Sequence, residues 1–142
     1  MSIDIIVEPE FTRRIVRSGL RGIAMRVYRA ERISRQRGLA IAIVGDKTMR
    51  QLNRDFHGVD APTDVLSFPA DDDESLGDIV ISYETAKVNA RAAHWRTRDE
   101  LELLVVHGIL HLLGYDDIEP EERARMWKRQ EKIMGRKINP ES

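Results

Sequence analysis

The sequence predicts an α+β fold, a single layered domain with a small mixed β-sheet and about five helices. The chain of 142 residues has the size of one compact domain, and no repeat or low-complexity linker divides it. Four short apolar runs have the length of buried strands, and longer segments carry apolar residues at helical spacing. Their order is strand, helix, strand, helix, two strands and then helices, which favours a mixed-sheet layered domain.

The first part of the chain contains all the expected strands. Strands are expected at residues 3–7, 39–44, 64–68 and 77–82, and helices at residues 11–36 and 46–56. The first helix is supported by apolar residues from Val16 to Ala30 that recur every three or four positions. Asp46 can cap the second helix, and Gly58 and Pro62 break the chain after it.

The remainder of the chain is expected to be helical. One helix runs from about Tyr83 to Trp95. Thr97 and Glu100 then match the capping box, in which each side chain satisfies a backbone donor of the other residue. The helix they open ends near Gly114, a plausible C-cap, and a last helix runs from Pro120 to Gly135.

Composition excludes several classes of site. The chain has no cysteine, so disulfides, thiolate metal sites and cysteine nucleophiles are excluded, and any metal must be held by His, Asp or Glu. The N-terminus lacks the basic and apolar regions of a signal peptide, and no apolar run is long enough to span a bilayer. We therefore expect a cytoplasmic protein.

The helix expected at residues 97–114 is apolar on almost all sides, so it should be buried. It nevertheless contains His107 and His111, which are four residues apart and project from the same face. Both imidazoles can reach one metal ion, and a carboxylate from the pair Asp116 and Asp117 can supply a third ligand. The alternative is two neutral core histidines that are each hydrogen-bonded, and spacing alone does not decide between them.

Gly108 bears on the kind of metal site. Zinc proteases of the His-Glu-x-x-His type carry their general base directly after the first histidine, and this position is Gly108 here. The helix therefore lacks the protease base. A glycine at this point instead indicates the close approach of another backbone segment.

The segment His107–Asp117 strongly resembles the motif H-G-x-L-H-L-x-G-Y-D-H of the YbeY family, the bacterial endoribonucleases of ribosomal-RNA maturation. Two further blocks are similar to that family, Leu52–Phe56 with Asp60–Pro69 and then Leu76–Ile79. The blocks keep the order and spacing of the family, so the resemblance covers nearly the whole chain.

The resemblance implies one metal-dependent endoribonuclease domain over residues 1–142. It implies one zinc-type ion per chain, held by three ligands, which in this chain are His107, His111 and Asp117. It further implies 3′-end maturation of 16S ribosomal RNA and ribosome quality control. The partners would be single-stranded ribosomal RNA precursor and the ribosome or its small subunit, with no membrane and no specificity for DNA.

Two residues depart from the family pattern. Asp117 stands where the family has its third histidine, and aspartate is a good oxygen ligand for zinc, although affinity and preferred metal can change. His57 stands where the family usually has an arginine, and a histidine carries only partial charge at neutral pH. His57 is our candidate catalytic residue, for charge stabilisation or proton transfer.

Two further groups of charged residues, the arginines near the first helix and two aspartates in the strand blocks, each allow two interpretations. Nine arginines lie between Arg13 and Arg37, and six of them would share one face of the first helix, either following an RNA backbone or simply facing solvent. Asp64 and Asp78 either hydrogen-bond near the metal site or fix a turn.

The sequence thus predicts a zinc-dependent endoribonuclease acting on single-stranded RNA. The first rival is a non-catalytic ribosome-associated factor in which the metal only stabilises the fold. The second is a zinc peptidase, which Gly108 disfavours.

Overall fold

The computed structural model of the protein describes residues 2–138. In chain order the elements are β1 (Ile3–Val7), the 3-10 helix η1 (Pro9–Arg14), α1 (Arg17–Ala30), β2 (Gly38–Val44), α2 (Asp46–His57), β3 (Val65–Pro69), β4 (Ser75–Ser82), α3 (Tyr83–Ala93), α4 (Thr97–Leu112) and α5 (Pro120–Met134). Among these described residues, no helix has the length and hydrophobicity needed to cross a membrane.

The four strands form one mixed sheet in the order β1-β2-β4-β3. The first three of these are parallel, with Ile5 beside Ile41 and Ile41 beside Ile79. β3 runs antiparallel to β4, so that Ser67 lies opposite Ile79. The predicted α+β class, with a small mixed sheet, is confirmed.

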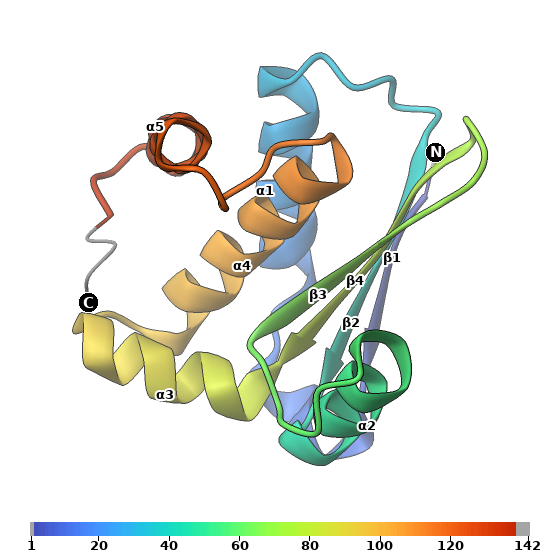
Figure 1. The fold of residues 1–142 in the computed structure, drawn as a ribbon, viewed down its shortest axis with the longest axis vertical. Helices are drawn as coiled ribbons and strands as arrows, with labels where there is room; N and C mark the ends of the chain where they lie inside the picture. The colour runs from blue at the N-terminus through green and yellow to red at the C-terminus, as the bar shows by residue number, and fades with distance from the viewer. Residues whose placement is uncertain (1, 139–142) are drawn as a thin grey trace.

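The helices are layered unequally on the sheet. Figure 1 shows α1 and α4 along one face of the sheet, with α3 and α5 packed against α4 and farther from the strands. On the other face α2 lies near one end, where Met49 closes a small apolar cluster with Val44, Leu66 and Val80. α4 is thus enclosed by other elements along most of its length, and any polar side chain on it needs a partner.

The prediction of one continuous helix over residues 11–36 is wrong. Residues 9–14 form a 3-10 helix, Ile15 and Val16 are extended, and α1 covers only residues 17–30. Ile15 and Val16 are β-branched and fit an extended backbone well, which is the physical reason for the break. The six arginines therefore do not share one helical face.

Two of those arginines have structural partners. Arg17 donates a hydrogen bond to the backbone oxygen of Ile5, and Arg21 Nε donates to the oxygen of Ile3 at 3.2 Å. β1 is an edge strand of the sheet, so the backbone oxygens on its outer side have no neighbouring strand to bond. The two guanidinium groups supply hydrogen bonds to these oxygens. This contact favours a structural reading of Arg17 and Arg21 over contact with RNA.

α4 begins one residue from the predicted cap. Its N-cap is Arg96, whose backbone N–H donates to Asp99 Oδ2 at 3.1 Å, so the capping pair is Arg96 and Asp99. Glu100, predicted to complete the capping box with Thr97, instead accepts a hydrogen bond from Trp95 Nε1 at 3.0 Å.

Candidate metal centre

The last turns of α4 bring His107 and His111 to one side of the helix. Their ring centroids are 4.7 Å apart, and their side chains keep 22% and 32% of their exposure. The helix is held close to the sheet at Gly108, where an added Cβ would lie 2.9 Å from two side-chain atoms of the fully buried Ile79. The predicted close approach is therefore real, although the neighbour is a side chain of β4 rather than a backbone segment.

A tight reversal after α4 returns a carboxylate to the histidines. Gly114 has φ +100°, a conformation that L side chains rarely adopt, and Tyr115 N–H donates back to the oxygen of Leu110 at 3.0 Å. The Asp117 carboxylate then lies 3.8 Å from His107 Nε2 through Oδ2 and 3.8 Å from His111 Nε2 through Oδ1. All three donor atoms lie within 4.8 Å of one another.

Asp116 does not share this geometry. Its Oδ1 accepts a hydrogen bond from the backbone N–H of Ile118 at 3.1 Å, which stabilises the local turn. Of the acidic pair, the structure therefore brings Asp117 to the histidines. Its role as a metal ligand, like those of the two histidines, stays a prediction.

Gln130 orients the first histidine. This side chain of α5 is 1% exposed, and its Oε1 accepts a hydrogen bond from His107 Nδ1 at 2.7 Å. Because Nδ1 then carries the proton, the lone pair of Nε2 faces Asp117. The sequence reasoning missed Gln130, although it lies on the packing face of the last helix near Met126, where a polar side chain needs a reason.

A second network anchors the segment that carries Asp117. Tyr115 donates its hydroxyl hydrogen to Glu31 Oε1 at 2.7 Å, and Arg129 Nε donates to Glu31 Oε2 at 2.9 Å. Glu31 follows α1 and Arg129 lies on α5, so two helices fix the turn after α4. This restraint preorganises Asp117 in front of the histidines.

Electrostatics also suit a cation. Burial lowers the pKa of His107, against the opposing effect of the hydrogen bond to Gln130, so this imidazole is neutral near pH 7. A neutral imidazole is the form that binds metal. Asp117 adds a carboxylate to the two imidazoles, which complements the charge of a cation.

A pocket of about 480 Å³ opens in front of the three donors. Its lining includes His57, at the end of α2, and Asp64, which precedes β3, together with the three donor residues. Asp64 therefore lies beside the site, where its Oδ2 accepts a hydrogen bond from Asn89 Nδ2 at 3.3 Å. Asp78 is exposed on β4 and is not part of this lining.

The donor set fits a divalent ion. Two imidazole nitrogens and one carboxylate oxygen are a familiar zinc donor set, and three protein ligands leave positions for water or substrate. The opening toward the pocket means that such an ion would be reachable from solvent. A purely structural ion would more often be enclosed by four protein ligands.

Comparison with known proteins gives one consistent family. A sequence model described as Endoribonuclease YbeY matches residues 7–137. Proteins named Endoribonuclease YbeY are similar to this chain in Dehalococcoides mccartyi (34% identity, 94% of this chain and 88% of the relative), in Roseiflexus castenholzii (40%, 94% and 91%) and in Chloroflexus aurantiacus (45%, 78% and 80%). The solution structure of TM1509 from Thermotoga maritima matches with a TM-score of 0.66 at 29% identity, covering 93% of this chain and 86% of that one.

Proposed function

The chain belongs to the YbeY family of endoribonucleases, and from this premise we propose that it hydrolyses single-stranded RNA with one bound metal ion. The observation that carries the proposal is the group of His107, His111 and Asp117 in the lining of an open pocket. Zinc is the proposed ion, because two imidazoles and a carboxylate suit it.

Each residue of the site has a distinct task in this proposal. His107 and His111 present Nε2, Asp117 presents a carboxylate oxygen, and Gln130 keeps His107 in the tautomer that leaves Nε2 free. When bound, the ion would lower the pKa of a water molecule and polarise a phosphoryl oxygen.

We assign a supporting role to His57. It lines the same pocket from α2, on an element separate from the three donors, with its ring centroid 6.3 Å from that of Phe68. From there a protonated imidazole can stabilise negative charge on the phosphate or give a proton to the leaving oxygen. Histidine is suited to either task near neutral pH.

Membership of the family supports a proposal for the biological substrate. We propose the precursor of 16S ribosomal RNA, cut near its 3′ end in the cytoplasm, with the ribosome or its small subunit as partner. A pocket lined by the three donors suits a flexible single strand, whose phosphates can enter it, better than a rigid duplex.

One experiment separates this proposal from its rivals. Labelled RNA and casein are incubated with the protein, each with and without a chelator. Cleavage of RNA alone, abolished by the chelator, supports the proposal. Cleavage of casein would indicate a peptidase, and cleavage of neither would indicate a structural metal. A double variant, His107→Ala with His111→Ala, provides the control for contaminating nucleases and should retain no metal.

A further inference from the structure

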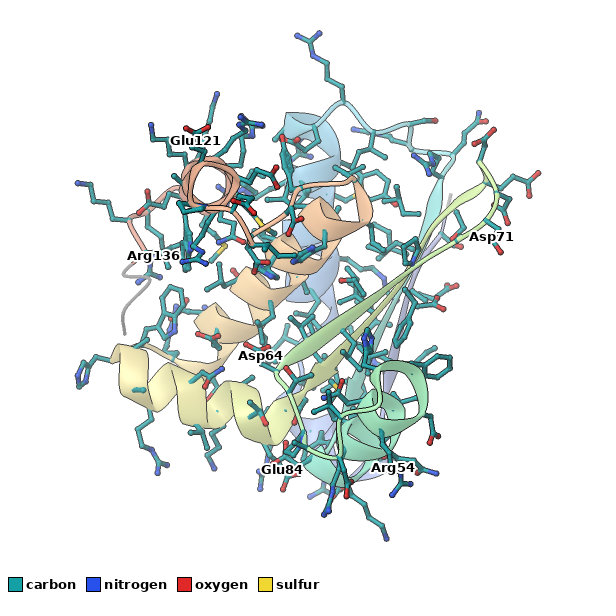
Figure 2. All side chains as sticks on the ribbon, in the orientation of Figure 1. Arg54, Asp64, Asp71, Glu84, Glu121 and Arg136 are labelled. Atoms are coloured by element: carbon teal, nitrogen blue, oxygen red, sulfur yellow. The ribbon has the colours of Figure 1, made fainter. Side chains whose placement is uncertain are left out.

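A second cavity adjoins the metal site. It has a volume of about 420 Å³ and lies between α3, α4, α5 and the segment after α5. It shares His107 and Asp64 with the pocket in front of the three donors, so the two hollows adjoin at these side chains. Figure 2 labels two of its lining residues, Asp64 beside the start of β3 and Arg136 beyond α5.

Glu100 is an unusual component of this cavity. It lies on the buried helix α4 and is only 6% exposed. Its Oε1 accepts the hydrogen bond from Trp95 Nε1, and within residues 2–138 no side chain or backbone group donates to Oε2. Burying a carboxylate is costly, and holding Trp95 requires only one of the two oxygens. The second oxygen is free to accept hydrogen bonds from a ligand in the cavity.

The remaining lining selects the kind of ligand. Trp95 and Trp127 supply aromatic surface, and the Arg136 guanidinium lies 4.9 Å from the Trp95 ring centroid, where it buttresses that ring. Arg136 and Lys137 line the cavity beside Asp64 and Glu100, so the two cations are balanced by two carboxylates and the lining has no excess of positive charge to attract a phosphate. The carboxylates favour N–H donors, although Asp64 Oδ2 already accepts one hydrogen bond from Asn89 Nδ2 at 3.3 Å. A flat, uncharged group with N–H donors meets both conditions, and nucleobases are such groups.

Guanine fits best among the bases. Its Watson–Crick edge carries adjacent N–H donors, on N1 and on the exocyclic N2, and these can reach Oε2 of Glu100 and the second lone pair of its Oε1 together. Adenine and cytosine offer only the amino group at that edge, and uracil offers a single N–H flanked by two acceptors.

We propose that this cavity is a base subsite that binds a guanine of single-stranded RNA while a neighbouring phosphate of the same strand lies at His107, His111 and Asp117. The proposal rests on the proposed function and adds a sequence preference to it. Glu100 is the specificity residue, and the two tryptophans provide the apolar walls.

Binding of nucleosides tests the subsite without any cleavage. The chain has two tryptophans, and both line the cavity, so their indole N–H signals in nuclear magnetic resonance spectra report its occupancy. Titration of the zinc-loaded protein with guanosine should shift both signals. Inosine, which lacks the N2 amino group, should bind more weakly, and adenosine and uridine should produce little shift.

A matched pair of variants assigns the effect to Glu100. Glu100→Gln should weaken guanosine binding by about tenfold or more, because the amide replaces an acceptor by a donor. Glu102→Gln alters a glutamate on the same helix outside the cavity lining and should leave guanosine binding unchanged. Thermal melts of both variants establish that they are folded.

Two results would overturn the proposal. One is equal shifts for guanosine and adenosine, and the other is guanosine binding that Glu100→Gln does not weaken.

A cleavage assay then relates the subsite to the reaction, with RNA strands that contain one guanine or one adenine in a run of uracils. Preference for the guanine strand should disappear in Glu100→Gln and persist in Glu102→Gln. If no strand is cleaved, the proposed function fails, while the nucleoside titrations still judge the subsite.

Discussion

Asp117 is the donor that tests the metal site most sharply, because it lies outside α4 and depends on the turn at Gly114. Loss of a residue that only orients a metal ligand typically weakens metal binding by roughly tenfold to hundredfold. Asp117→Ala removes a ligand itself, so it should weaken metal binding by at least that much. Asp117→His should keep or tighten binding, since imidazole suits zinc. Calorimetric zinc titration of the metal-free variants measures both effects.

The neighbouring Asp116 provides the control. Its carboxylate bonds the backbone N–H of Ile118, so Asp116→Ala should cost stability in the turn and little metal affinity. A helix-capping role for Asp117 is disfavoured, because the N-cap of α5 is Glu119. Loss of the ion in Asp116→Ala with its retention in Asp117→Ala would refute the ligand assignment.

Glu100 makes stability depend on pH. Burial raises the pKa of its carboxyl group, the hydrogen bond from Trp95 opposes this, and the nearby charge of Asp64 adds to it. Because the pKa of Glu100 is higher in the folded state than in the unfolded state, ionisation of its carboxyl group lowers the free energy of unfolding. This loss is absent at low pH, where the group is protonated in both states, and it is complete once the pH exceeds the folded-state pKa. Glu100→Gln should therefore melt at a higher temperature than the wild type near pH 7.5, and the difference should shrink as the pH falls to about 4. If the difference in melting temperature between Glu100→Gln and the wild type grew on acidification, the surroundings of Glu100 would stabilise its ionised form.

Individual residues of the site differ in how far the sequence reveals them. His107, His111 and the acidic pair were visible, because they are close together in the chain and chemically unusual in an apolar helix. Gln130 bonds a residue 23 positions away and has no local signal, and the local pattern at Glu100 was interpreted as a capping box rather than as a bond to Trp95. Their burial, which only the packing of α5 and α3 on α4 reveals, makes them significant.

Contact between α4 and β4 depends on Gly108. Gly108→Ala should destabilise the fold by about 1–3 kcal/mol, because the new methyl group would overlap Ile79 and the core is closely packed. Gly22→Ala, on α1, is the matched control, since nothing lies within 4 Å of its added Cβ. It should stabilise the protein by about 0.5–1 kcal/mol through helix propensity. Urea unfolding of both variants measures the two effects, and equal signs would refute this account of Gly108.

The edge of the sheet is the second element to test. Replacing Arg17 and Arg21 by Gln should lower stability by about 0.5–1.5 kcal/mol for each hydrogen bond lost to β1. If the arginines instead serve RNA, stability would stay unchanged while the salt dependence of RNA binding would flatten. Thermal melts and binding isotherms at several salt concentrations distinguish these outcomes.

Element boundaries show where sequence periodicity reaches its limit. The strands and the buried helix were predicted closely, because their apolar patterns are dense and bounded by glycine or proline. The segment 11–36 was predicted as one helix, since its apolar spacing remains helical across Ile15 and Val16. The break falls at these two adjacent β-branched residues, a local signal that the helical apolar spacing obscures.

Five elements of this small domain converge on the candidate metal centre. α4 supplies two donors, the turn after it a third, α5 and α1 fix their orientation, and α2 with β3 forms the opposite wall. The formal net charge is only −1, so long-range electrostatic attraction contributes little to RNA binding. The affinity for RNA must therefore come from contacts at the site itself. Metal content should therefore control activity directly.

The most direct test is a zinc titration of metal-free protein, with cleavage of a labelled single-stranded RNA as the readout. We expect no cleavage without metal, a linear rise with added zinc, and a plateau at one equivalent per chain. The variant His111→Ala, titrated in parallel, should remain inactive throughout. Full cleavage by the metal-free protein, or equal activity of His111→Ala, would contradict the claim that His107, His111 and Asp117 hold the catalytic ion.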